Sequence, residues 1–122
     1  MKKVTQISVF SSLFILMLLA ATSSSAQNIK PDTDNAGLTL PKGFAALKVA
    51  DNVGRTRHIV VNKQGAIYAK LERLDNGKGI VVLKDTDGDG RTETKTTFAN
   101  YIGTGIAIKG NYLYASSNKE VF

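Results

Sequence analysis

The residues of this chain best suited to chemistry are the acidic side chains of the stretch DTDGDGRTE, from Asp85 to Glu93. Carboxylates stand at alternate positions of this stretch, and Gly90 stands where a tight loop must reverse. Because a hard divalent cation prefers several oxygen ligands from one such loop, the pattern predicts a calcium site. The predicted ligands are four side-chain carboxylates and the backbone carbonyl of one basic residue: Asp85, Asp87, Asp89, Arg91 and Glu93.

The residues on either side of this loop distinguish it from an EF-hand. An EF-hand places its loop between two helices and ends it with a bidentate Glu at the twelfth position, which here is Thr96. The flanks Gly79–Lys84 and Thr94–Phe98 are rich in β-branched residues, which favour strands. We therefore expect a calcium loop that joins two strands and ends at Glu93. Asp and Gly also make turns without any metal, and the sequence leaves this alternative open.

The first 26 residues have the organisation of a secretion signal. Lys2 and Lys3 provide the positive start, Val9–Ala21 is mostly apolar, and small residues at Ser24 and Ala26 suit cleavage after Ala26. The apolar run is shorter than the roughly 20 residues that a membrane span needs. We expect a periplasmic or extracellular protein with no stable membrane span after cleavage.

The composition excludes several classes of protein. The chain has no cysteine, so it has no disulfides, no lipoprotein anchor and no haem attached through Cys-x-x-Cys-His. Its formal charge of +6 falls to +4 when Lys2 and Lys3 are removed, and the basic residues are scattered without clustered aromatics. This pattern does not favour nucleic-acid binding. The polar stretch 27–37 is expected to be a flexible lead-in to a domain that spans residues 38–122.

That domain is predicted to be all-β. No long segment keeps apolar residues at helical spacing, and seven segments read as strands: Ala45–Ala50, His58–Asn62, Ala66–Leu71, Gly79–Lys84, Thr94–Phe98, Gly105–Lys109 and Tyr112–Ser116. Two hairpins look alike, with Tyr68 and Tyr114 separated by 46 residues and Val61 and Ile108 by 47. A period in the forties is typical of β-propeller blades. The segment would hold the first blade and part of the second, as the N-terminal part of a longer protein; a complete small β-domain is the alternative.

Single side chains are given structural roles. Tyr68, Tyr112 and Tyr114 are expected to pack between blades, Phe44 and Phe98 to be apolar anchors, and four lysines to be exposed: Lys42, Lys48, Lys70 and Lys84.

Three stretches in order, LPKGF (Leu40–Phe44), Arg57–Val61 and Gly65–Tyr68, resemble the opening blade of sorbosone and glucose dehydrogenase-like proteins, and the stretch from Asp85 to Phe122 continues the likeness. The resemblance implies a six-bladed propeller that binds pyrroloquinoline quinone, often with calcium, and oxidises a sugar hydroxyl or aldehyde. The partners would be a sugar substrate and an electron acceptor, and the cofactor would do the redox chemistry.

The resemblance assigns no catalytic and no cofactor-binding residue to this segment. The catalytic His and the cations that hold the quinone belong to later blades, and His58 would have a structural role. Characterised relatives place a quinone-contacting Gln just before the second blade, whereas Tyr101–Thr104 contains none. The calcium of the Asp85–Glu93 loop would be structural. A secreted, non-enzymatic propeller that binds glycan or protein is the alternative function, and a small calcium-dependent β-module is a third.

Overall fold

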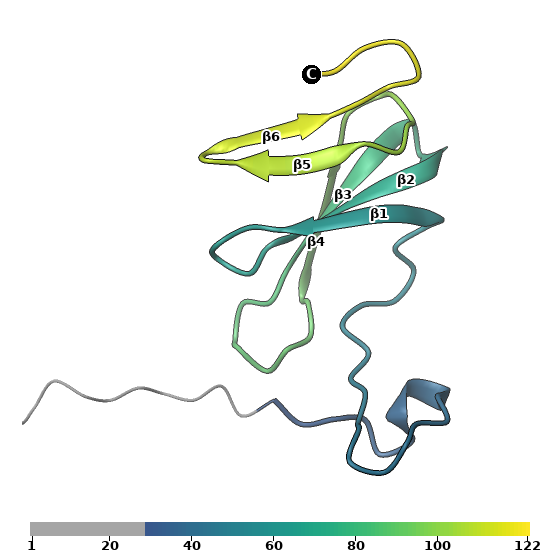
Figure 1. Ribbon diagram of the computed structural model, residues 1–122, viewed down its shortest axis with the longest axis vertical. Coiled ribbons are helices and arrows are strands. Elements are labelled where there is room, and N and C mark those ends of the chain that lie inside the picture. Colours follow the sequence, from purple (N-terminus) through teal and green to yellow (C-terminus); the bar gives the residue numbers. More distant parts are fainter. Residues whose placement is uncertain (1–28) are drawn as a thin grey trace, which may run out of the picture.

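The computed structural model describes residues 29–122, in which short strands follow one another along the chain (Figure 1). The predicted signal segment and the first two residues of the predicted lead-in lie outside the described residues. The described elements, in chain order, are η1 (Asn35–Gly37), β1 (Thr56–Val61), β2 (Ile67–Asp75), β3 (Lys78–Lys84), β4 (Thr94–Phe98), β5 (Ile106–Lys109) and β6 (Tyr112–Ala115). None of the described helices is long and apolar enough to cross a membrane.

The all-β prediction is confirmed for the described residues. β1 to β4 form an antiparallel sheet in chain order, and β5 and β6 form a separate hairpin. Figure 1 shows this hairpin beside the four-stranded sheet, with the N-terminal segment beyond the sheet on the other side. Neither sheet closes on itself, so a propeller is not identified among the described residues.

Six of the seven predicted strands are present, and β4 has the predicted bounds. The prediction of a strand at Ala45–Ala50 is wrong. In this segment the carbonyl of Ala46 accepts a hydrogen bond from the amide of Asp32, and the carbonyl of Val49 accepts one from the amide of Thr92. The segment is apolar and extended, but its backbone bonds to two irregular stretches instead of a neighbouring strand.

Strand alternation gives the four-stranded sheet two different faces. One face carries the core residues Ala69, Leu71, Val81 and Leu83, against which Ala50 and Val53 of the N-terminal segment pack. The opposite face carries Ile80, which packs with Ile106 and Ala115 of the β5–β6 hairpin. β3 is therefore buried on both sides, which explains its unbroken apolar run GIVVL.

Two predictions for single side chains are wrong. Lys70 was expected to be exposed, but alternation along β2 directs it to the face that the hairpin covers, and it is fully buried. Phe44 and Phe98 were expected to be apolar anchors, but both are exposed. Tyr68 is partly buried against the hairpin, whereas Tyr112 and Tyr114 are exposed.

Candidate metal centre

The predicted calcium loop joins β3 to β4, two antiparallel neighbours of the sheet. Each strand ends at the loop, so the sheet fixes both ends of the nine-residue stretch. Gly88 and Gly90 have φ of 83° and 91°, and this left-handed backbone favours glycine. The chain therefore reverses where the glycine pattern predicted.

Carboxylate oxygens of four loop residues lie within 4.8 Å of one another: Asp85, Asp87, Asp89 and Glu93. The structure thus brings together the four residues predicted to bind through their side chains. Asp85 is half-buried and the other three are exposed. Four negative charges at this separation repel one another, so the arrangement favours a bound cation.

Backbone amides hold the Asp85 carboxylate in place. The amide of Gly88 donates to Oδ1 at 2.6 Å, and the amide of Gly90 donates to Oδ2 at 2.9 Å. These donors stabilise the ionised form and hold the pKa of Asp85 below its usual value. Asp85 therefore remains a charged ligand candidate in mildly acidic solution.

Glu93 is held at the other end of the loop. Its Oε2 accepts the amide of Thr86 at 2.7 Å and the Thr86 hydroxyl at 2.9 Å. These two bonds lower the pKa of Glu93, against a smaller opposing effect of the neighbouring Asp85 charge. They also close the loop at the ninth position.

Asp87 and Asp89 make only local turn contacts. Oδ1 of Asp87 accepts the amide of Asp89 at 3.2 Å, and Oδ1 of Asp89 accepts the amide of Arg91 at 2.7 Å. The second oxygens of both side chains, like Oε1 of Glu93, accept no hydrogen bond from the described residues. These three oxygens remain available to a cation.

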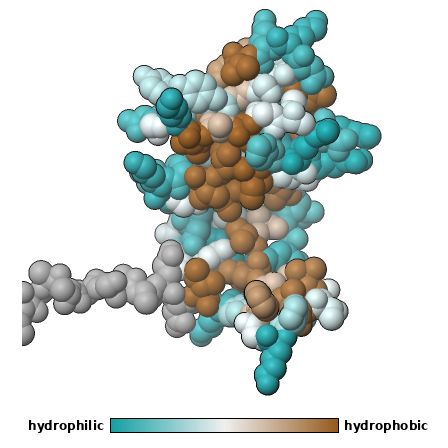
Figure 2. Space-filling view, in the orientation of Figure 1, coloured by the Kyte–Doolittle hydropathy of each residue, from teal (hydrophilic) through white to brown (hydrophobic). Residues whose placement is uncertain are grey.

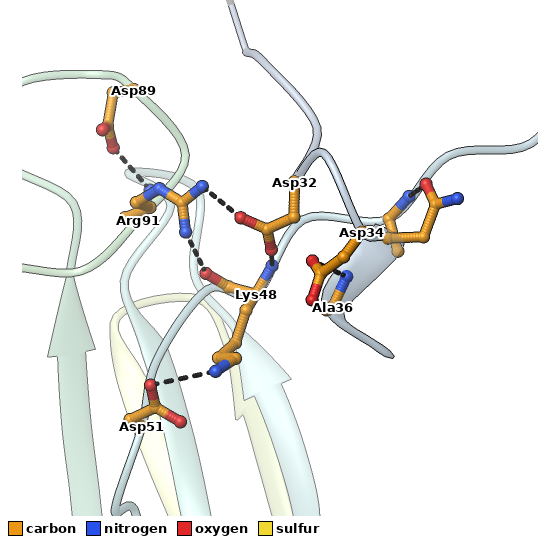
Figure 3. Close-up of polar contacts among 9 residues, drawn as sticks. Asp32, Asp34, Ala36, Lys48, Asp51, Asp89 and Arg91 are labelled. Atoms are coloured by element: carbon orange, nitrogen blue, oxygen red, sulfur yellow. Dashed lines mark hydrogen bonds and ion pairs between the residues drawn. The ribbon is translucent and has the colours of Figure 1, made fainter. Parts of the chain in front are cut away.

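Arg91 was predicted to bind through its backbone carbonyl, and its side chain extends away from the acidic cluster. The guanidinium donates to Oδ1 of Asp32 at 2.6 Å and to the carbonyl oxygen of Lys48 at 3.0 Å (Figure 3). The ion pair lowers the pKa of Asp32 and raises that of Arg91. Arg91 therefore connects the loop to the N-terminal segment without neutralising the four clustered carboxylates.

Further contacts tie the loop to the same segment. The hydroxyl of Thr92 donates to the Val49 carbonyl oxygen at 3.2 Å, and the amide of Lys48 donates to Oδ2 of Asp32 at 2.7 Å. No pattern in the sequence pointed to Asp32 or Lys48, because these contacts join residues more than forty positions apart. The described part of the expected lead-in is thus held against the loop.

His58 begins the inner part of β1, and its ring is exposed. Its Nδ1 lies 3.0 Å from the carbonyl oxygen of Thr104. Because a carbonyl only accepts, this contact assigns the proton to Nδ1. The bond connects the first sheet to the approach to β5, which is a structural role.

A scan of protein-family models and searches of curated proteins and of solved structures found no match for this chain.

Proposed function

We propose that the Asp85–Glu93 loop binds one calcium ion, and that the ion stabilises a blade in the N-terminal part of a secreted β-propeller. The observation that carries the proposal is the group of four carboxylates within 4.8 Å. Among the described residues, the ion pairs join other carboxylates to Lys48, Arg55 and Arg91. The clustered charges therefore have no protein counter-ion there, and a divalent cation would supply one.

Calcium suits this loop better than magnesium does. Calcium accepts six to eight oxygens in flexible geometry, whereas magnesium demands a near-ideal octahedron and keeps several waters. The candidate ligands come from one exposed loop that can adjust, and solvent can complete the shell. The site would fix the β3–β4 connection and would take no part in catalysis.

A melting experiment tests the calcium proposal. Calcium at a hundred times its dissociation constant should stabilise the fold by about 2.7 kcal/mol relative to chelator. Asp87→Asn and Asp89→Asn should abolish this gain, because Asn keeps the turn contact through Oδ1 but loses the charge. Asp34→Asn is the matched control, since Oδ1 of Asp34 accepts the amide of Ala36 in a similar local contact outside the cluster. Equal melting temperatures in calcium and chelator would contradict the proposal.

For the whole protein we propose a periplasmic quinoprotein that oxidises a sugar or sorbosone. The support is the resemblance of residues 38–122, the repeated hairpin and the calcium loop. When bound, pyrroloquinoline quinone would accept the hydride of the substrate, and an external electron acceptor would reoxidise it.

The described residues do not themselves fit the quinone. His58, the single His of the chain, contacts the Thr104 carbonyl. Three of the cationic side chains are engaged elsewhere: Arg55 with Glu72, Arg91 with Asp32, and Lys70 with Tyr101. We therefore assign no catalytic step to this part of the chain.

The coding sequence downstream of Phe122 tests the enzymatic proposal. We expect further repeats of about 46 residues, with a His on an inner strand and several Arg and Lys residues in later repeats. The protein loaded with quinone and calcium should then reduce a dye when sugar is added. A stop codon directly after Phe122 would contradict the proposal. So would an intact propeller that binds glycan but neither binds quinone nor reduces dye, and this result would favour the non-enzymatic alternative.

A further inference from the structure

The two hairpins that look alike in sequence also pair their strands in the same register. Three cross-strand pairs of β1 and β2 have equivalents in β5 and β6. In the first hairpin they are Ile59–Ala69, Val60–Tyr68 and Val61–Ile67, and in the second they are Ile106–Ala115, Ala107–Tyr114 and Ile108–Leu113. The turn of the second hairpin is one residue shorter, which accounts for the change from 47 to 46 residues.

The equivalence extends to the next strand. Ser116 forms a bridge with Val121, and the backbones of Ala115 and Phe122 exchange two hydrogen bonds. In the first repeat, Lys70 pairs with Ile80 and Ala69 with Val81 in the same manner. The molecule therefore contains two copies of one structural unit.

Contact between the two units shows how such units pack. The side of the second hairpin that carries Ile106 and Ala115 lies against the side of the first sheet that carries Val60, Tyr68 and Ile80. Ile106 and Ala115 are each only 4% exposed. One side of a unit thus covers the opposite side of its neighbour.

Applied to the first unit, this equivalence identifies an uncovered surface. We call the side with Ile59, Val61, Ile67 and Ala69 the leading face, because its equivalent in the second unit is the buried one. The N-terminal segment packs against Ala69 and its neighbours, but Ile59 and Val61 remain 53% and 54% exposed. Figure 2 shows apolar atoms gathered over the middle of the molecule, where Figure 1 places β1.

The second unit has the complementary uncovered surface. We call the side with Ala107, Tyr112 and Tyr114 the trailing face, because its equivalent in the first unit is covered by the hairpin. Tyr112 is 71% exposed and Tyr114 is 43% exposed. Each open face is thus equivalent to one half of a contact that the molecule already makes.

We propose that the leading face of one copy of this chain binds the trailing face of a second copy. The two faces differ, so the contact is head-to-tail, and each bound copy still offers one open face. Such contacts build closed rings or open filaments according to the rotation between units. The inference does not depend on calcium or quinone.

Sedimentation of the purified chain tests this contact. The average mass should rise with protein concentration in both calcium and chelator. Val61→Glu blocks the leading face and Tyr114→Glu blocks the trailing face, so each variant alone should remain monomeric, with self-association weakened at least tenfold. An equimolar mixture should form dimers and nothing larger, because each variant keeps the face that the other lacks.

The controls separate this contact from other outcomes. Phe44→Glu changes an exposed apolar residue outside both faces and should associate as the unmodified chain does. Val61→Thr and Tyr114→Ser provide the same comparison with milder changes if a charged variant melts at a lower temperature. The inference is overturned if the chain is monomeric at about 1 mM. It is also overturned if either blocked variant still dimerises alone, or if the mixture of the two contains only monomers.

Discussion

At one end of the four-stranded sheet, four carboxylates of the β3–β4 loop lie within 4.8 Å of one another near solvent. At the other end, Lys70 is fully buried. Its Nζ donates to the carbonyl oxygen of Tyr101 at 3.0 Å and lies 4.0 Å from the centre of the Tyr101 ring. The exposed charges are like-signed and can take a counter-ion from solution, whereas the buried charge depends on the fold for its partners.

The difference separates function from architecture. The loop can change its occupancy without disturbing the core, because its carboxylates are held by local backbone amides. Lys70 cannot lose its partners without exposing a buried ammonium, because the Tyr101 ring stacks in turn on Phe122, with centroids 4.2 Å apart. We therefore expect perturbations at the Lys70 end to affect folding, and perturbations at the loop to affect cation binding and acid stability.

The largest effect is expected at Gly79, beside the Lys70 site. A Cβ at Gly79 would overlap the carbonyl oxygen of Tyr101, which is backbone and cannot move aside cheaply. Gly79→Ala should lower the free energy of unfolding by more than about 3 kcal/mol. Gly77→Ala is the control, because its φ is also positive or strained for alanine but nothing lies within 4 Å of its Cβ position; its cost should be about 1–2 kcal/mol. Similar urea midpoints for the two variants would argue against the close approach.

Lys70 itself should show a smaller effect that depends on the replacement. Lys70→Ala leaves a cavity and should cost about 2–3 kcal/mol, whereas Lys70→Met fills the space without a charge and should cost much less. Burial lowers the pKa of Lys70, so the unfolded state binds this proton more tightly than the folded state does. Stability should therefore rise with pH from the folded pKa toward the usual value near 10.5. Denaturant titrations should show this rise in the unmodified chain and not in Lys70→Met; a rise of equal size in both would contradict it.

The loop end should respond to acid in the opposite sense. The pKa values of Asp85 and Glu93 are lowered by their hydrogen bonds, so the unfolded state binds these protons more tightly. Their contribution is present above the usual values of 3.8 and 4.5 and is lost as the pH falls below them toward the folded pKa values. Melting temperatures in chelator should fall over this range, and less steeply in Asp85→Asn. A fall of the same steepness in both proteins would contradict this assignment.

The smallest effect is expected for Arg91→Lys. The guanidinium contacts Asp32 and the Lys48 carbonyl together, while an ammonium would keep at most one of these geometries. Because the pair is exposed, the melting temperature should fall by a few degrees at most. The amides of Asp32 and Lys48 should nevertheless exchange hydrogen severalfold faster, while amides of β3 should not. Unchanged exchange at Asp32 and Lys48 would show that Arg91 does not hold the N-terminal segment.

Much of the architecture could be predicted because it follows local rules. Strand alternation and turn glycines located six strands, and the Asp spacing identified the four carboxylates that converge. The repeat of Val61 in Ile108 and of Tyr68 in Tyr114 identified two hairpins that pair in the same register. In each case, neighbours in sequence determine the structure.

The failures involve contacts between distant parts of the chain. Ala45–Ala50 has the composition of a strand, but its backbone partners are Asp32 and Thr92. Lys70 is charged and was assigned to solvent, but the Tyr101 carbonyl and ring accommodate its ammonium on the covered face. The pairing of Arg91 with Asp32 spans 59 residues and left no pattern in the sequence.

A calorimetric titration of the purified chain with calcium tests the central claim most directly. We predict saturable binding of one ion per chain, with a dissociation constant of about 1 mM or tighter, as in other extracellular modules. Asp87→Asn should weaken binding at least tenfold, and Asp34→Asn should leave it unchanged. Absence of saturable binding up to about 10 mM calcium, or equal binding by Asp87→Asn and the unmodified chain, would contradict the claim that the four carboxylates form a calcium site.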